Sequence, residues 1–281
     1  MRIQAECLHC LLRQVTDAVV MTGADDKIKH DIMKKELELL SDYESYASPP
    51  HIAGPMHNCV RAMSGCHDPY HNIKEKDMAT AKANFPLVEE YIATKDDALY
   101  WGIKAACAGN TLDSAANPGG SFKESMAAEL DTPYGICDIE LLREKLKTAK
   151  KVLILADNSD ETYFDVLMLR ALGDVEIIYA VRDCPSINDA TVEIAERSGI
   201  AEYATIISSG STAPGTILSE ATAEFREAFE TADVVISKGQ GNYEALDDAN
   251  REIFYLFKVK CPVISKHFGI EMGKYVLKNK G

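Results

Sequence analysis

Apolar and polar positions follow a helical rhythm over the first part of this chain of 281 residues. Between Leu8 and Val19, apolar side chains recur every three or four positions, which is the stripe of an amphipathic helix. Further helices are expected at residues 25–41, 51–64 and 95–108. The segment after them is rich in Gly, Ser, Asn and Pro, and it predicts a connector.

From Asp138 onwards, short apolar runs alternate with helical segments. Parallel strands are expected at residues 152–156, 175–181, 203–207, 233–236 and 262–265, with helices at 138–150, 160–172, 188–198, 217–230 and 243–258. Repeated strand–helix units imply right-handed crossovers and a parallel sheet with helices on both faces. A final run at 273–277 predicts an edge strand.

The pattern therefore predicts an α/β fold. We expect a three-layer α/β/α sandwich with a mainly parallel, Rossmann-like sheet, preceded by an all-helical region. Along the chain, the helical N-terminal region is 1–110, the connector is 111–137, and the α/β/α domain with the candidate site is 138–281.

Five polar residues, Asp157-Asn158-Ser159-Asp160-Glu161, directly follow the first predicted strand. The turn that leaves a parallel strand lies at the carboxyl edge of the sheet, where ligands bind. A nucleotide-binding fold places glycines there, whereas this chain places hard oxygen ligands that suit a divalent cation. Ser159, Asp160 and Glu161 could instead cap the next helix. Capping is a less natural role for Asp157, because it ends the strand itself.

The other strand ends also carry polar side chains, and parallel strands bring them to one edge. They are Asn188 and Asp189, the turn 208–212, the turn 238–244, and Lys266. Glycines in the turn 238–244 let backbone amides approach an anion, whose charge Lys238 and Lys266 could neutralise. The alternative is that both lysines are solvated surface charges.

Composition limits the classes of partner. The net charge of −14 argues against nucleic acid or an anionic membrane as a partner, because phosphate backbones require clustered Lys and Arg. No apolar stretch approaches the roughly 20 residues of a membrane span. The N-terminus lacks the apolar core of a signal peptide, so we expect a cytoplasmic location.

Two of the eight cysteines, Cys7 and Cys10, form a Cys-x-x-Cys pair on the first predicted helix. A tetrahedral zinc site needs two further ligands. The pair is therefore a candidate second metal site or redox pair. The alternative is that Cys7 is a small buried apolar group and Cys10 is incidental.

Several motifs together resemble a known family, the metal-dependent damage-control phosphatases, also catalogued as domain of unknown function 89. They are DNSDE (157–161), ND (188–189), KGQGNYE (238–244) and CPVISKHFG (261–269). Three N-terminal motifs resemble its prokaryotic branch with a Cys-x-x-Cys: CLHCLLRQ (7–14), DPYHNIK (68–74) and AGNTLD (108–113). The chain departs from the family at Asp160, where Gly is usual, so the resemblance carries over the reaction class and not a specific substrate.

The resemblance implies a helical region packed on an α/β/α sandwich and one divalent metal ion, commonly manganese, nickel, cobalt or magnesium. By motif match, the metal ligands and catalytic residues are Asp157, Asn158 and Asp189. The phosphate-contacting lysine is Lys266.

We therefore expect a metal-dependent phosphomonoesterase that acts on small phosphorylated metabolites such as sugar phosphates. The turn with Ser209, Gly210 and Ser211 is expected to bind phosphate together with Lys266. The expected substrate contacts are Asn110, Asp113, Lys238, Asn242 and Glu244. Two alternatives remain open: an S-adenosylmethionine-dependent carboxyl methyltransferase, which the anionic turn after the first strand disfavours, and a non-catalytic protein that binds metal and phosphate.

Overall fold

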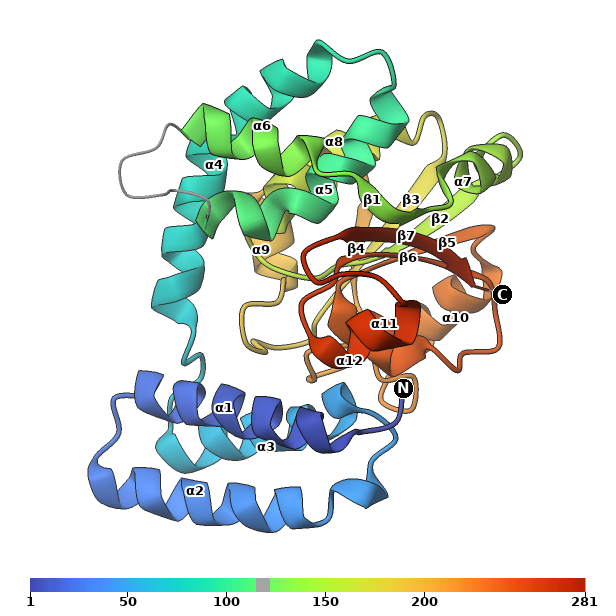
Figure 1. Ribbon diagram of the computed structural model, residues 1–281. Helices are drawn as coiled ribbons and strands as arrows, with labels where there is room; N and C mark the ends of the chain where they lie inside the picture. Colours follow the sequence, from blue (N-terminus) through green and yellow to red (C-terminus); the bar gives the residue numbers. More distant parts are fainter. Residues whose placement is uncertain (115–121, 281) are drawn as a thin grey trace.

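The computed structural model describes residues 1–114 and 122–280, with the side chains of 1–109 and 124–280 (Figure 1). Its N-terminal part is helical: α1 (Ala5–Met21), α2 (Asp26–Ser41), the short 3-10 helix η1 (Tyr43–Ser45), α3 (Pro49–Ser64), α4 (His71–Ala93), α5 (Ala98–Ser114) and α6 (Phe122–Asp131). The apolar pattern does not predict α4, because Pro86 interrupts it and few large apolar residues mark its buried face.

Seven strands form one sheet in the order β1-β7-β6-β5-β2-β3-β4. Their bounds are β1 (Tyr134–Cys137), β2 (Lys151–Leu155), β3 (Glu176–Val181), β4 (Thr205–Ser208), β5 (Val234–Lys238), β6 (Ile253–Lys258) and β7 (Tyr275–Lys280). The β6–β7 pair is antiparallel, and the other neighbouring pairs are parallel.

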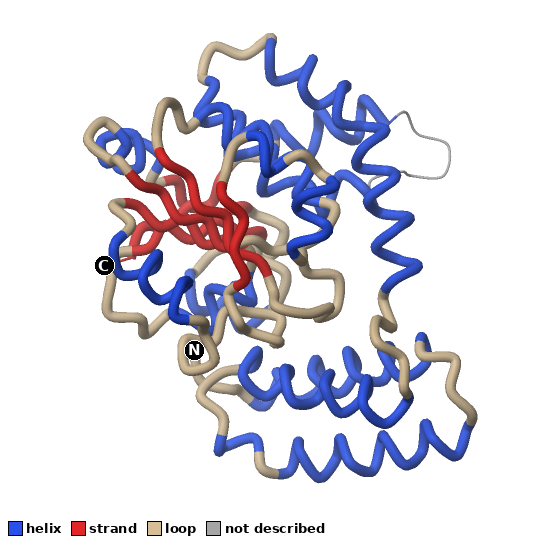
Figure 2. Tube along the Cα trace, turned by 180° about the vertical axis from the view of Figure 1, so that it is seen from behind, coloured by secondary structure: helices blue, strands red, loops and turns tan. Residues whose placement is uncertain are grey.

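The helices between the strands are α7 (Ile139–Leu146), α8 (Glu161–Ala171), α9 (Val192–Arg197), the 3-10 helix η2 (Ile200–Glu202), α10 (Ala223–Thr231), α11 (Gln240–Leu246) and α12 (Pro262–Phe268). Figure 2 shows the sheet in the middle with helices on either side. This arrangement confirms the predicted α/β architecture.

Two elements near the C-terminus differ from the prediction. The helix expected at 243–258 is the short helix α11 followed by β6. The strand expected at 262–265 is part of α12. Both differences have a local cause: the aromatic run in Ile253–Lys258 favours a strand, and Pro262 suits the first turn of a helix that Cys261 caps.

The expected connector, 111–137, contains α6 and β1. Strand β1 pairs in parallel with β7, with Ile136 opposite Val276. The run expected as an edge strand at 273–277 therefore corresponds to β7, which lies inside the sheet between β1 and β6. The two paired strands, β1 and β7, are separated by about half the length of the chain. The local sequence pattern therefore does not reveal that they pair.

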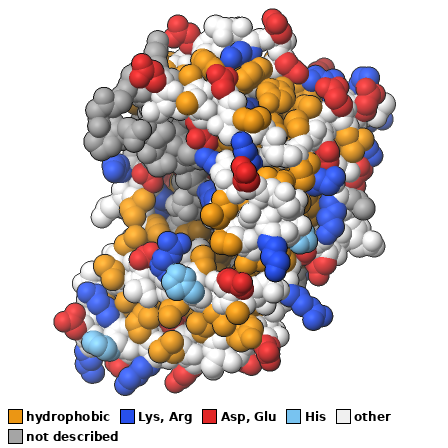
Figure 3. Space-filling view, in the orientation of Figure 1, with side chains coloured by type: hydrophobic (Ala, Val, Ile, Leu, Met, Phe, Trp, Pro, Cys, Tyr) orange, Lys and Arg blue, Asp and Glu red, His pale blue; other side chains and the backbone are white. Residues whose placement is uncertain are grey.

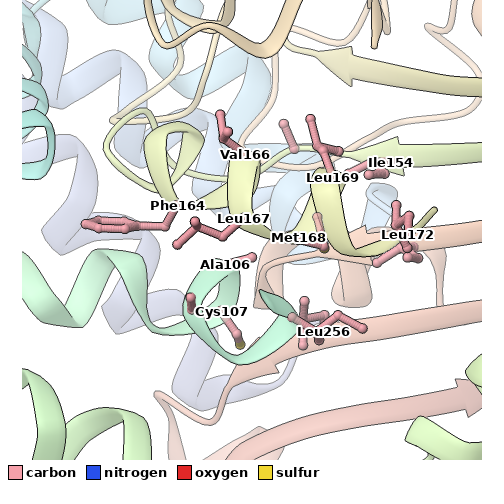
Figure 4. Packing of buried hydrophobic residues seen from close by; sticks show 14 of the residues in the cluster. Ala106, Cys107, Ile154, Phe164, Val166, Leu167, Met168, Leu169, Leu172 and Leu256 are labelled. Carbon is pink, nitrogen blue, oxygen red and sulfur yellow. The ribbon is translucent and has the colours of Figure 1, made fainter. Parts of the chain in front are cut away.

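Helices α5 and α8 cross closely on one face of the sheet (Figure 4). A Cβ atom on Gly102 would lie 2.8 Å from the carbonyl oxygen of Leu167, so glycine permits this approach. Further along α5, a Cβ atom on Gly109 would lie 3.1 Å from the Cα atom of Glu161. The crossing therefore brings the C-terminal part of α5 against the first turn of α8.

Helices α1, α2 and α3 have an apolar core of their own, which includes Leu11, Val15, Ile32, Ile52 and Met56. On the face shown in Figure 3, acidic and basic side chains are interspersed, so the negative charge is not gathered into one block there. None of the described helices has the length and apolar character needed to cross a membrane.

One carboxyl group, that of Glu36 on α2, is buried among these helices. Neither of its oxygens has a hydrogen-bond partner among the described nitrogen and oxygen atoms, although the Cys59 thiol lies close by. Burial raises the pKa of Glu36 to about 7. The folded state therefore holds this proton to higher pH than the unfolded state does, and stability falls as the pH rises from the unfolded pKa through about 7.

The variant Glu36→Gln should remove this pH dependence. The free energy of unfolding of the wild type should fall by about 3 kcal/mol more than that of the variant between pH 4.5 and pH 8. Urea denaturation at a series of pH values measures the difference. The control is Glu38→Gln on the same helix, because Glu38 is exposed and pairs with Lys35. An equal decline in Glu36→Gln and the wild type would contradict the account.

Candidate active site

The turns that follow β2 and β3 are joined by backbone hydrogen bonds. The N–H of Ala190 donates to the carbonyl oxygen of Asp157 at 2.8 Å, and the N–H of Ser159 donates to that of Asn188 at 2.8 Å. Asn158 and Asp189 form an isolated antiparallel bridge. The structure thus brings together Asp157, Asn158 and Asp189, as the sequence predicts.

Three carboxylates, those of Asp157, Glu161 and Asp189, lie near this point. The side-chain amide of Asn158 donates to Asp157 Oδ2 at 3.2 Å and to Glu161 Oε1 at 3.0 Å. Burial raises the pKa of Asp157 well above its usual range, and the charges of Glu161 and Asp189 raise it further. The edge of the sheet therefore concentrates negative charge around Asp157.

Gly239, the residue after β5, packs directly against the side chain of Asp157. A Cβ atom on this glycine would lie 2.1 to 2.3 Å from the carboxylate atoms of Asp157. Its φ of +84° also lies in the left-handed region that favours glycine. Only glycine therefore allows the backbone after β5 to lie this close to the carboxylate of Asp157, which follows the neighbouring strand β2.

Lys238, a predicted substrate contact, pairs with two buried carboxylates. Its ammonium group is buried and lies 2.6 Å from Glu161 Oε2 and 2.6 Å from Asp165 Oδ1. The Tyr179 hydroxyl donates to the other oxygen of Asp165 at 2.5 Å. Burial opposes the charge of Lys238, but the two carboxylates raise its pKa above the usual value. The lysine therefore holds Glu161 in place, and its charge is already offset.

Asn242, also a predicted substrate contact, is likewise bonded within the protein. Its side-chain nitrogen donates to the carbonyl oxygens of Ala156 and Lys238, at 2.9 and 2.7 Å. Its oxygen accepts from the backbone and hydroxyl of Thr216 and from Arg182. The residue is fully buried, so its hydrogen-bonding groups face the protein.

Arg182 completes this buried network, and sequence reasoning did not assign it a role. Its Nε atom donates to Asp189 Oδ2 at 2.7 Å, and the pair is about 2% exposed. Burial raises the pKa of Asp189, while the Arg182 guanidinium opposes that rise. The sequence signal that could have revealed this role is an arginine at the end of a buried strand, seven positions before the expected metal ligand Asp189.

A small pocket lies beside Asp157. Its lining residues are Cys107, Asp157, Glu161, Gly239, Gln240, Leu256, Phe257, Lys258 and Lys260. The charge of Lys260 acts against the raised pKa of Asp157. The backbone N–H of Lys260 donates to Gln240 Oε1 at 3.2 Å, which fixes the turn after β6. Sequence reasoning missed Lys260 because it placed the last parallel strand at 262–265 instead of 253–258.

Lys266 and the serine turn lie outside that set of lining residues. Lys266 is exposed in the last turn of α12. In the turn 208–212, the amide of Gly210 donates to the Ser208 hydroxyl at 3.1 Å and that of Ser211 to the Ser209 hydroxyl at 3.3 Å. The next helix, α10, begins only at Ala223. The turn is thus not the helix N-terminus that the expected anion cradle requires, and two of its amides are already bonded.

Glu244 is not among the residues that line the pocket. Its carboxylate accepts from Gln240 Nε2 at 2.8 Å, and burial raises its pKa to about 7. Cys7 and Cys10 are half-buried, and burial raises the pKa of Cys7.

Among the described residues, no group of three or more His, Cys, Asp or Glu is placed to hold a metal ion. The side chains of Asn110 and Asp113 lie outside the described residues.

Comparison with known proteins supports this fold and shows the family of the chain. The chain belongs to the damage-control phosphatase ARMT1-like domain family, whose model matches residues 3–276. It is 34% identical to an uncharacterised protein of Methanocaldococcus jannaschii, over 98% of this chain and 95% of that protein. It is 32% identical to a damage-control phosphatase of Pyrococcus horikoshii, over 100% and 99% of the two chains.

The solved structures include a crystal structure of a protein of the DUF89 family from Pyrococcus horikoshii. It matches with a TM-score of 0.90 and 32% identity, and it covers 100% of both chains. The resemblance read from the motifs is thereby confirmed at the level of the family. Membership supports a hydrolase of the phosphatase type, while the branch marked by a Cys-x-x-Cys stays a prediction.

The variant Gly239→Ala should destabilise the protein far more than an alanine at another left-handed glycine. The control is Gly273→Ala, since Gly273 has a φ of +85° and open space around its Cβ position. The control should lose about 1–2 kcal/mol, the strain of an alanine in the left-handed region. Gly239→Ala should lose at least about 2 kcal/mol more, because the methyl group displaces Asp157. Equilibrium denaturation measures both losses, and similar values would contradict the close packing.

Proposed function

We propose that this protein is a metal-dependent phosphatase that hydrolyses small phosphorylated metabolites, sugar phosphates among them. One observation carries the proposal: three carboxylates lie near one another where two neighbouring parallel strands end, and the side-chain amide of Asn158 contacts two of them. Membership of the damage-control phosphatase family supports the reaction class.

The donor set fits a hard divalent cation such as magnesium, manganese, cobalt or nickel, because carboxylate and amide oxygens are suitable ligands. Asp157, Asn158 and Asp189 would hold the ion. A cation would also relieve the repulsion that helps to raise the pKa of Asp157. Since no three His, Cys, Asp or Glu are placed to hold an ion by themselves among the described residues, the oxygen of Asn158 is an essential part of the proposed set.

When bound, such a cation would supply Lewis-acid activation of the phosphate and offset its charge. The chain's own residues supply the remaining functions. Asn158 orients Asp157 and Glu161 by donating to both. Lys260 lines the same pocket and would bind the phosphate oxygens by its positive charge.

The organic part of the substrate would meet the C-terminal part of α5. Gly109 packs against Glu161, and Asn110 is the next residue along the helix. We therefore retain Asn110 and Asp113 as proposed sugar contacts. We leave Asn242 out of the proposed sugar contacts, because its side-chain oxygen and nitrogen already bond within the protein.

Removal of metal by a chelator should abolish hydrolysis of a sugar phosphate and of an aryl phosphate, and one of the four divalent ions should restore it. Asp157→Asn should lower kcat by at least roughly a hundredfold, because it removes a ligand charge. Asp183→Asn is the control, since Asp183 is exposed on a neighbouring turn and bonds Ser208. Full activity in the chelated enzyme, or in Asp157→Asn, would exclude the proposed chemistry.

The two candidate lysines can be separated by parallel alanine variants. Lys260→Ala should lower kcat/KM by roughly a hundredfold, because a charged donor to the phosphate is lost. Lys266→Ala should stay within about twofold of the wild type, as surface substitutions usually do. Steady-state kinetics with one phosphomonoester tests both. A large loss of kcat/KM in Lys266→Ala with little loss in Lys260→Ala would show that Lys266 binds the phosphate.

A further inference from the structure

Arg61, in the last turn of α3, contacts the turn that leads from β3 to Asp189. Its guanidinium donates to the backbone carbonyl of Pro185, and its Nη2 atom lies 3.1 Å from the Cys184 sulfur. The same group donates to the side-chain oxygen of Asn58, which fixes its orientation on the helix. A residue of the N-terminal helices thus reaches into the turn that carries an expected metal ligand.

The contacted turn has a strained backbone. Ile187 has a φ of +41°, and it is the one non-glycine residue with a positive φ in the part of the chain that the structure describes. Such a conformation is unfavourable for a β-branched side chain and persists only where its surroundings hold it. Ile187 stands two residues before Asp189, so relaxation of this strain would act on the backbone that carries Asp189.

Contacts on both sides of Ile187 hold this turn. On the sheet side, the carbonyl oxygen of Asn188 accepts from the backbone and hydroxyl of Ser159, at 2.8 and 2.7 Å. On the helical side, Arg61 holds Pro185. Arginine suits this task because its planar fork of donors serves the Pro185 carbonyl and Asn58 at the same time.

We propose that Arg61 is a positioning residue of the active site, which keeps the strained turn in the conformation that presents Asp189 to the cation. The inference rests on the proposed function, because it assumes a metal ion held by Asp157, Asn158 and Asp189. A role in packing alone would lower stability and leave metal affinity unchanged. Residues that hold metal ligands in place typically change metal affinity when they are substituted.

The test is the affinity of chelator-stripped protein for Mn²⁺, measured by isothermal titration calorimetry. Arg61→Ala should weaken binding by about tenfold to a hundredfold. Arg61→Lys, which keeps the charge and a donor, should recover part of the loss. Arg143→Ala is the matched control, because it breaks an ion pair with Asp97 between α7 and the helical part and should bind Mn²⁺ as the wild type does.

Asp157→Asn in the same assay separates this inference from the proposed function. If Asp157→Asn loses Mn²⁺ while Arg61→Ala binds it as tightly as the wild type, the positioning role is wrong and the metal site stands. If Asp157→Asn binds Mn²⁺ normally, the proposed metal site is wrong, and the role of Arg61 fails with it. Should Arg61→Ala not fold, Arg61→Met keeps the apolar stem without the donors, and the same criteria apply to it.

Discussion

The constraint on which the rest of the structure depends is the concentration of carboxylates at one edge of the sheet. Buried charges are costly unless they are paired. Lys238 lies between Glu161 and Asp165, and Arg182 pairs with Asp189. The buried side chains of Lys238 and Arg182 thus hold the carboxylates of Glu161, Asp165 and Asp189 in place. Asp157 has no ion pair of its own among the described residues, and this is the basis of the cation site proposed there.

The helices before the sheet are part of the same construction. Helix α5 crosses α8 so closely that Gly102 and Gly109 are needed, and this crossing covers the first turn of α8 where Glu161 lies. From the other side, Arg61 of α3 reaches the turn before Asp189. The site is therefore assembled from helices and sheet together, and stability and ligand geometry cannot be assigned to separate halves of the chain.

The places where prediction failed share a physical cause. Strand β6 and helix α12 were exchanged for a helix and a strand because short apolar runs fit both periods, so the turn after β6, which carries Lys260, was not recognised. Strand β1 pairs with β7 across most of the α/β region, which no local pattern reveals. Lys238 and Asn242 stand in a motif at a strand end, but both point into the protein, and only packing decides that direction.

By itself, the sequence determined the alternation of strands and helices and the position of Asp157, Asn158 and Asp189 at neighbouring strand ends. These follow from local hydrophobic period and from the common direction of parallel strands. Only the tertiary structure decided which polar residues face the pocket and which are used inside the protein. That choice depends on hydrogen-bond partners far apart in the chain, such as Arg182 with Asn242 and Lys238 with Glu161, which meet only when the sheet and its helices have packed.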